Sequence, residues 1–436
     1  MKITHYCNSF ISAEFSKNII YCDPWVGTTK DNGWVSYPID EKSIKNLNKP
    51  DYIYISHLHC DHFDEKTLRR IKKKKQKVII KDYRIKTLKK KLEKAGLKEI
   101  LELKPWKKYT INKEFEVAII PQISSNSSEK EEQIDYDIDT SIVLRCKKTN
   151  KVFYNNVDNP LSVTDLKKVN RFIKKVFNSP VNILCFGVGA ASEYPQCFLN
   201  IKRSEEKKKV INNSINKLKT ILKIFKPKIF FPAGGTYKIY GKFHRLNKYI
   251  AQASFKQVKE TNFKNILFKN LIGGKSIDLN KNKIKNNILK TVNTNTLNSK
   301  KYFYDKDKYS LKELDSLFNA AKINYFYRIK KTKFKTDWKI KFYIYKDLTL
   351  DNNSQIEEKK SKLIKNFEVI CQNNTKKFKN SSFTQLNCYL DAGLFHGLLK
   401  RRYVWNSPVS GSLILYKRFP NTFDPNVSFS LNYLTL

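Results

Sequence analysis

Three of the six histidines in this chain lie within one six-residue stretch, residues 57–62, whose sequence is HLHCDH. Imidazole nitrogens are common ligands of zinc and iron, and carboxylate oxygens complete many of these ligand sets. Because histidine is scarce elsewhere in the sequence, the clustering of His57, His59, Asp61 and His62 predicts a metal site. We assign His57 and His59 to one metal position, and Asp61 and His62 to a second position beside it.

The spacing of this metal motif suits a pair of divalent ions. The apolar run Tyr52–Ser56 precedes the motif and is typical of a buried β-strand. Where that strand ends, His57 and His59 lie on the same side of the extended backbone, and Asp61 and His62 follow in the turn. Two ions about 3.5–4 Å apart can hold a hydroxide nucleophile between them and stabilise a developing oxyanion. We therefore expect one or two divalent metal ions, zinc or iron, as cofactors.

Further ligands must come from elsewhere in the chain. Asp158 follows an apolar run and is the candidate bridging carboxylate, although an aspartate just before Pro160 also suits a simple turn. His244 follows a later strand candidate, so it either closes the site or is an unrelated histidine. Asp139 opens another strand candidate, where it either supplies a ligand oxygen or caps a turn. Asp61 and Asp158 are the candidate catalytic residues, because they can orient the nucleophile or carry protons.

The segments that must position these ligands alternate between short apolar runs and lysine-rich amphipathic stretches. This alternation predicts an α/β layered domain. The strand candidates are Asn18–Cys22, Tyr52–Ser56, Val78–Ile80, Phe115–Ile120, Ser141–Arg145, Val152–Tyr154, Ile183–Phe186 and Lys228–Phe231. The helix candidates are Glu65–Lys75, Arg84–Ala95, Leu161–Phe177 and Ser204–Phe225.

The sequence divides into three parts. Residues 1–278 form the predicted metal-binding domain, and residues 279–301, rich in Lys, Asn and Thr, are expected to be a linker. Residues 302–436 are expected to form a C-terminal α+β region that acts as a cap or in dimerisation. We predict helices near Lys360–Phe378 and Asp391–Arg401 and a strand near Ser412–Tyr416. Arg401, Arg402 and Trp405 are candidates for the substrate entrance.

The composition limits the class of protein. The chain has 436 residues, 40% of them hydrophobic, which suffices for one large domain and a smaller one. Its eight cysteines include no CxxC pair, which favours reduced thiols in a cytoplasmic protein over a disulfide framework. No run reaches the roughly 18 apolar residues that span a bilayer. We therefore expect a cytoplasmic protein that has no membrane span.

The formal net charge of +45 favours anionic partners. The excess is mostly lysine and comes with abundant Asn and Ile, so codon bias explains it as well as a binding surface does. Phosphate-reading surfaces more often use the planar guanidinium of arginine. We therefore expect an anionic small-molecule substrate, and we do not expect nucleic acid to be the main partner.

The H-x-H-x-D-H motif after a strand resembles that of the metallo-β-lactamase superfamily. The resemblance implies an αβ/βα sandwich, in which two sheets lie face to face with helices outside. Asp158 and His244 match, in order and context, the later aspartate and histidine ligands of that superfamily. The intervening histidine ligand is absent, and the segment Asp135–Asp139 occupies its place. This departure favours a carboxylate-rich iron site over zinc at the first position.

A narrower resemblance is to the metallo-β-lactamase-like part of the CMP-N-acetylneuraminic acid hydroxylases, and it covers about residues 3–275. The shared blocks are residues 23–25 (DPW), 33–34 (GW), 50–62, 139–140 (DT), 156–158 (NVD), 189–192 (GAAS), 194–195 (YP) and 232–234 (PAG). Those hydroxylases also carry a Rieske [2Fe–2S] module with C-x-H and C-x-x-H ligand pairs. The only C-x-H here is Cys60–His62, inside the metal motif, and there is no C-x-x-H. A separate Rieske-type electron donor is therefore expected if the reaction is an oxidation.

Three functions follow from these residues and resemblances. The first is a hydroxylase-like metalloenzyme that acts on an anionic sugar or sugar nucleotide with a separate electron donor. The second is a metal-dependent hydrolase of a phosphoester, lactone or amide that uses a metal-bound hydroxide. The third is a non-catalytic protein that binds metal or polyanions. A homodimer is compatible with each of them.

Overall fold

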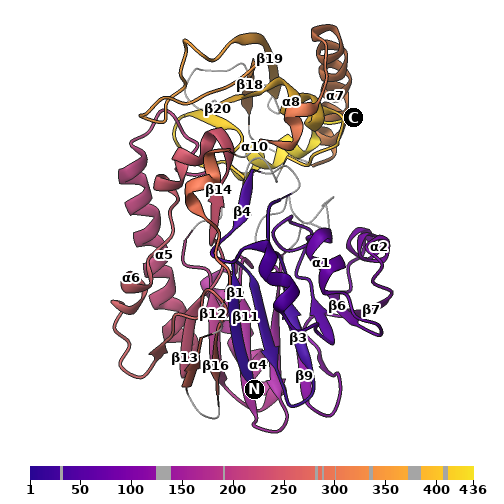
Figure 1. The fold of residues 1–436 in the computed structure, drawn as a ribbon, viewed down its shortest axis with the longest axis vertical. Coiled ribbons are helices and arrows are strands. Elements are labelled where there is room, and N and C mark those ends of the chain that lie inside the picture. Colours follow the sequence, from indigo (N-terminus) through magenta and orange to yellow (C-terminus); the bar gives the residue numbers. More distant parts are fainter. Residues whose placement is uncertain are drawn as a thin grey trace.

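The computed structural model describes residues 1–29, 33–123, 139–189, 192–279, 283–286, 289–299, 301–332, 337–371, 384–405 and 411–436. In this part of the chain, two sheets and their outer helices form an elongated lower body, and the C-terminal region lies across one end of it (Figure 1). Asp135, which belongs to the segment expected to replace the missing histidine, lies outside the described residues.

The first sheet contains β1 (Lys2–Cys7), β2 (Phe10–Glu14), β3 (Ile19–Cys22), β5 (Tyr52–Tyr54), β6 (Lys77–Lys81), β7 (Glu99–Leu103), β16 (Lys275–Asp278) and β17 (Lys283–Lys285). Within the described residues its order is β17-β16-β1-β2-β3-β5-β6-β7. The strands β3, β5, β6 and β7 are parallel, so their carboxyl ends lie at one edge. The predicted metal motif begins just after β5, at that edge.

The second sheet contains β8 (Lys108–Thr110), β9 (Phe115–Pro121), β10 (Thr140–Cys146), β11 (Lys151–Asn156), β12 (Val181–Phe186), β13 (Ile229–Pro232) and β15 (Leu267–Phe268). Its order among the described residues is β15-β13-β12-β11-β10-β9-β8, with β11, β12 and β13 parallel. Side chains of both sheets, among them Ile11, Phe115 and Ile183, share one buried apolar cluster. The two sheets therefore lie face to face.

Helices cover the outer faces of both sheets. They are α1 (Glu65–Ile71), α2 (Thr87–Lys94), α4 (Val163–Phe177), α5 (Arg203–Phe225) and α6 (Phe255–Lys259). Leu68 and Leu88 bury α1 and α2 against the first sheet, and Val169 and Leu218 bury α4 and α5 against the second. Figure 1 shows α1 and α2 on one side of the sandwich and α5 on the other. The predicted αβ/βα sandwich is confirmed, and the predicted helices lie close to their expected positions.

The C-terminal region is a second α+β layer. Its elements are α7 (Leu311–Thr332), β18 (Trp338–Tyr345), β19 (Leu363–Cys371), β20 (Thr384–Asp391), α8 (Ala392–Leu399), β21 (Leu415–Phe419) and α10 (Pro425–Ser430). The strands form a sheet in the order β19-β18-β20-β21. The structure therefore contains the predicted helix near Asp391–Arg401 and a strand close to the one predicted near Ser412–Tyr416.

The helix predicted near Lys360–Phe378 is wrong where the structure describes this segment. Residues 363–371 form β19, which pairs antiparallel with β18, and residues 372–378 lie outside the described residues. Phe367, Val369 and Cys371 are buried at alternate positions. This two-residue period is that of a strand, and the exposed apolar Ile370 between the buried positions obscured it in the sequence.

The described part of the expected linker contacts the N-terminal sandwich. β17 extends the first sheet by pairing with β16. Farther along, the Val292 N–H donates to Pro38 O at 2.8 Å and the Asp40 N–H donates to Lys290 O at 2.9 Å. These hydrogen bonds hold the segment against the sandwich.

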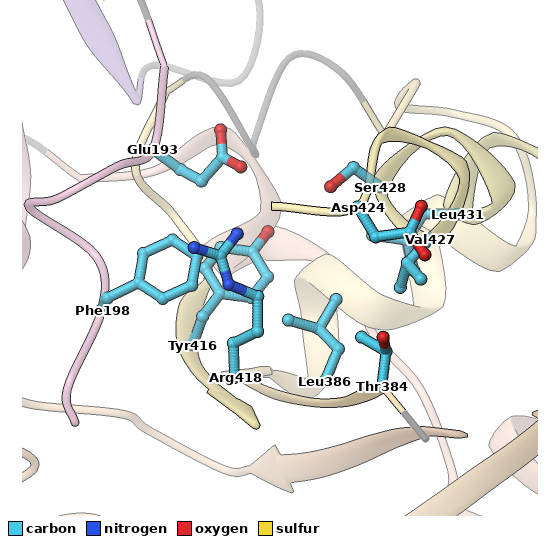
Figure 2. A pocket seen from close by; sticks show the side chains of 10 residues that line it. All are labelled: Glu193, Phe198, Thr384, Leu386, Tyr416, Arg418, Asp424, Val427, Ser428 and Leu431. Atoms are coloured by element: carbon cyan, nitrogen blue, oxygen red, sulfur yellow. The ribbon is translucent and has the colours of Figure 1, made fainter. Parts of the chain in front are cut away.

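The C-terminal region is joined to the sandwich through the segment 193–200. Leu199 N donates to Tyr416 O at 2.8 Å, Tyr416 N donates to Cys197 O at 2.9 Å, and the rings of Phe198 and Tyr416 stack with centroids 5.3 Å apart. The Arg418 guanidinium lies over the Phe198 ring, beside a small cavity of about 20 Å³ (Figure 2). That volume admits about one water molecule, so this contact is structural.

A buried ion pair makes a second connection between the two regions. Lys242 Nζ lies 2.8 Å from Asp391 Oδ2 and 2.7 Å from Asp347 Oδ1. Asp391 also accepts hydrogen bonds from Leu348 N and from the Tyr304 hydroxyl. Because the Asp391 side chain is only 6% exposed, its negative charge depends on these partners.

No helix in the described part of the chain is long and apolar enough to cross a bilayer.

Replacing Lys242 with alanine should lower the free energy of unfolding by about 2–3 kcal/mol, because the Asp391 carboxylate would stay buried without its counter-charge. The measurement is urea unfolding followed by tryptophan fluorescence. Lys360→Ala removes an exposed lysine that pairs with Glu357 at the surface, and should change the free energy by less than about 1 kcal/mol. Equal losses in the two variants would show that the buried pair does not hold the regions together.

Candidate metal centre

The first group of candidate ligands contains His57, His59 and Asp139. Their donor atoms lie within 4.8 Å of one another. His57 Nε2 is 2.7 Å from His59 Nδ1 and 3.1 Å from Asp139 Oδ1. Asp139 is the residue directly before β10 of the second sheet, and the two histidines follow β5 of the first sheet. Both sheets therefore contribute to this group. The sequence predicted all three residues as ligands, and the structure brings them together.

The second group contains Asp61, His62 and Asp158, again with donor atoms within 4.8 Å of one another. His62 Nε2 lies 2.7 Å from Asp158 Oδ2 and 3.5 Å from Asp61 Oδ2. Asp158 follows the carboxyl end of β11 with φ +66°, a conformation that turns the chain sharply. Gly234 lies beside this residue with φ +92°, and an added Cβ there would come within 3.0 Å of Val157 Cγ1.

Groups behind the histidines fix their orientation. Asp23 Oδ2 lies 2.9 Å from His62 Nδ1, and its carboxylate accepts hydrogen bonds from both N and Oγ of Ser56. The Ser56 hydroxyl also lies 2.8 Å from His57 Nδ1. Histidines that bind metals usually have their second nitrogen hydrogen-bonded in this way. The arrangement leaves Nε2 of both His57 and His62 facing the other candidate ligands.

The electrostatics of the two groups fit a bound cation. Burial lowers the pKa of His57 well below its usual value, and His62 and His59 lower it further, so His57 is neutral with a free lone pair. Burial would also lower the pKa of His62, but Asp61 and Asp23 outweigh burial and raise it. The carboxylates thus favour positive charge at the second group. Nitrogen and oxygen donors in a field that favours cations are what a divalent metal ion requires.

The turn between β1 and β2 contacts the second group. Asn8 Nδ2 donates to Asp61 Oδ2 at 2.9 Å, and Ser9 Oγ lies 3.2 Å from His62 Nε2. Sequence reasoning missed Asn8, Ser9, Ser56 and the link from Asp23 to His62. Asn8, with φ +42°, is a residue type that tolerates the left-handed conformation, but a single Asn-Ser pair does not reveal a site.

The structure does not bring His244 to either group. It lies on the 3-10 helix η2 (Gly241–Tyr249), where its Nδ1 is 2.9 Å from Gly241 O. The turn of Gly234 and Gly235 that precedes it runs next to Asp158 instead. Neither group found among the described residues includes His244, so its match to the later histidine of the superfamily stays a prediction. Order along the chain does not fix which side chain after β13 faces the ligands.

A large cavity of about 1390 Å³ borders both groups, through His59 and Asp139 of the first and Asp61 and Asp158 of the second. The sandwich contributes its floor, and residues 401–405 of the C-terminal region line it as well, as the sequence predicted for Arg401, Arg402 and Trp405. Besides the candidate ligands Asp61, Asp139 and Asp158, two carboxylates and seven cationic side chains line it. Those nine residues are Asp64, Glu65, Lys66, Arg69, Lys91, Lys94, Lys217, Arg401 and Arg402.

Comparisons with known proteins agree with this geometry. The family described as "Beta-lactamase superfamily domain" matches residues 18–155. The chain is 34% identical over 113 residues to a protein of Mycolicibacterium smegmatis named as a Rieske 2Fe-2S iron-sulfur protein, covering 26% of this chain and 22% of the relative. It is 25% identical over 281 residues to cytidine monophosphate-N-acetylneuraminic acid hydroxylase of Xenopus laevis, covering 61% of this chain and 41% of the relative.

Among solved structures, CmlA, a diiron beta-hydroxylase from Streptomyces venezuelae, has a TM-score of 0.43 and 14% identity, covering 64% of this chain and 54% of that chain. The chain spans about a fifth of the mycobacterial relative and two fifths of the hydroxylase. Both sheets, the position of the metal motif after β5 and the family match lead to one assignment. Residues 18–155 match the beta-lactamase superfamily domain, the two described sheets form an αβ/βα sandwich, and in this region the chain is similar to a CMP-N-acetylneuraminic acid hydroxylase.

Proposed function

We propose that this chain is a metal-dependent enzyme that hydroxylates an anionic sugar or sugar nucleotide with electrons from a separate protein. The observation that carries the proposal is the convergence of three imidazoles and three carboxylates beside one cavity, which His59 and the three carboxylates line and whose other charged residues are mostly cationic. Similarity to a named sugar-nucleotide hydroxylase supports the same reading. We expect this activity in the cytoplasm.

His57, His59 and Asp139 would hold one metal ion, and Asp61, His62 and Asp158 would hold the other. Half of these six ligands are carboxylates, which suit iron better than a set of histidines and thiolates would. Bound iron supplies the one-electron steps and the activation of oxygen. Asp23 and Ser56 keep the imidazoles oriented throughout the reaction.

The two candidate catalytic carboxylates differ in their surroundings. The Asp61 side chain is 6% exposed and accepts a hydrogen bond from Asn8, which suits a fixed ligand. Both carboxylates line the cavity, but the Asp158 side chain is 24% exposed. Asp158 is therefore the better placed of the two to take a proton from a substrate or return it.

The cavity suits a substrate of this class. Its volume of about 1390 Å³ exceeds the roughly 300–1,000 Å³ of common small-molecule sites, so it can enclose a sugar with a nucleotide attached. Cationic side chains from α1, α2, α5 and the segment 401–405 line it. They would attract phosphate and carboxylate groups and hold them away from the carboxylates of the metal groups.

A hydroxylation needs an external supply of electrons. It places one oxygen atom of O₂ in a C–H bond and reduces the other to water, which consumes two electrons and two protons. Similarity to proteins named as Rieske 2Fe-2S iron-sulfur proteins supports a Rieske-type centre as the donor. We propose that this centre lies outside these 436 residues, which contain no Cys-x-x-His pair.

Hydrolysis is the second candidate. The matched family is described by its beta-lactamase members, and cleavage of a phosphoester, lactone or amide needs no electron donor. The same ligands would then hold zinc, with Asp158 carrying the proton to the leaving group.

Assays with loaded protein separate these two functions. The iron-loaded chain, given O₂, a reductant and CMP-N-acetylneuraminic acid, should yield a product heavier by one oxygen atom, detected by mass spectrometry. Without reductant no product should form. Reductant-independent cleavage of phosphoesters by the zinc-loaded chain would favour hydrolysis. Less than one metal ion per chain after reconstitution with either metal would rule out both functions.

His59→Ala and Asp61→Ala should each lower the metal content by about one ion per chain and abolish turnover, because each removes a ligand from one group. Metal content is measured by plasma mass spectrometry, and folding by circular dichroism. His244→Ala is the matched control, since His244 lies outside both groups, and should bind as much metal as the unchanged chain. Full metal content in His59→Ala and Asp61→Ala would contradict the assignment.

Asp23→Ala should weaken metal binding by about 10- to 100-fold without removing a ligand, because His62 would lose the carboxylate that orients its ring. Competition with a chelator measures the affinity. Asp40→Ala, at an exposed helix cap, should leave the affinity unchanged. An affinity in Asp23→Ala equal to that of the unchanged chain would show that the link from Asp23 to His62 is dispensable.

A further inference from the structure

One cation in the cavity lies apart from the others. Lys217 is on α5, whereas Lys66 and Arg69 are on α1 and Lys91 and Lys94 on α2. Figure 1 shows α5 on the opposite side of the sandwich from α1 and α2. The ligand-bearing ends of β5 and β11 lie between them. A substrate that reaches from the metal groups toward α5 would therefore meet Lys217.

Lys217 has no counter-charge in the described structure. Two other cations of the cavity are already paired, Arg69 with Glu65 and Arg402 with Asp307. Lys217 instead lies over an apolar ring, with its Nζ 5.5 Å from the centroid of Phe186. Desolvation by its neighbours lowers the pKa of Lys217, and no described carboxylate acts in the opposite direction. Lys217 is an exposed residue at the cavity wall, so an anion bound in the cavity can reach it and supply the missing counter-charge.

The surroundings of Lys217 are rigid and have room for a ligand. α5 is a helix of 23 residues, and Phe186, which ends β12, is only 7% exposed. Gly187 follows it on the cavity wall, where an added Cβ would meet only Ala233 O at 3.6 Å. The backbone at this point therefore leaves space between the strand end and the lysine. Both Lys217 and Arg401 are exposed, but Lys217 lies within the long helix α5, whereas Arg401 lies in a turn after α8.

We propose that Lys217 is a specificity-determining residue that binds an oxyanion of the substrate, a phosphate or a carboxylate, and orients the substrate against the metal groups. The inference rests on the proposed function, because it assumes that the cavity binds the reacting molecule. The inference adds to that function the residue that recognises the anionic group of the substrate. Lys217 is not a metal ligand, so its contribution can be measured separately from metal binding.

The test is calorimetric titration of the metal-loaded full chain with cytidine monophosphate, with cytidine, and with N-acetylneuraminic acid. Lys217→Gln should weaken the binding of at least one anionic probe by about tenfold and leave cytidine binding unchanged. Loss for cytidine monophosphate alone identifies a phosphate subsite, and loss for N-acetylneuraminic acid alone identifies a carboxylate subsite. Lys217→Arg should restore most of the affinity.

Lys219→Gln is the matched control, because it removes the same charge from the same helix at a position outside the cavity. It should change the affinity less than about twofold. Equal binding of all probes by Lys217→Gln and Lys219→Gln would overturn the inference, as would failure of the unchanged chain to bind either anionic probe.

These outcomes are distinct from failure of the proposed function. Metal content and oxygen-dependent turnover test that function, and neither requires the binding measurements. If the chain bound no metal but lost cytidine monophosphate binding in Lys217→Gln, the anion subsite would stand and the hydroxylase would not. If Lys217→Gln had normal metal content and turnover and bound every probe as the unchanged chain does, the hydroxylase would stand and the anion subsite would not.

Discussion

The carboxylate of Asp23 holds the metal motif in place. It accepts hydrogen bonds from the backbone and hydroxyl of Ser56 and contacts the Nδ1 of His62, so one side chain connects the end of β3 to the whole loop after β5. Ser56 extends the same network to His57. These contacts orient the imidazoles, but the three carboxylates of the metal groups still repel one another. A cation among them would relieve that repulsion.

The cavity depends on a second constraint, the contact between the sandwich and the C-terminal region. The backbone hydrogen bonds of Leu199 and Tyr416 and the ion pair of Lys242 with Asp391 hold that region over the ligand-bearing edge. It contributes residues 401–405 to the cavity lining. The sandwich provides the chemistry, and the C-terminal region encloses the space in which a substrate is positioned. Figure 1 shows this arrangement, with the C-terminal layer across one end of the sandwich.

Much of the sandwich was predictable, because many of its strands are buried on both faces and appear in the sequence as apolar runs. The bounds of β6, β9, β10, β11 and β12 lie within two residues of those predicted. The strands β1 and β2 were missed, since Thr4, His5 and Ser12 are buried polar residues that interrupt the apolar pattern. β19 was mistaken for a helix for the opposite reason, since its apolar Leu363 and Ile370 are exposed and break the alternation. Local pattern identifies a strand only where burial and hydrophobicity coincide.

The sequence by itself determined the motif at 57–62 and the superfamily that it resembles, because the ligands in one loop have a spacing that a local pattern contains. It also identified Asp139 and Asp158. Asp139 precedes one apolar run and Asp158 follows another, and these two ends meet where the neighbouring antiparallel strands pair. Only the tertiary structure decided that His244 stays on η2, that Asn8 and Ser9 reach the second group, and that Lys217 lines the cavity. Those residues are far from the motif along the chain, so their positions follow from how the sheets, α5 and the C-terminal region pack together.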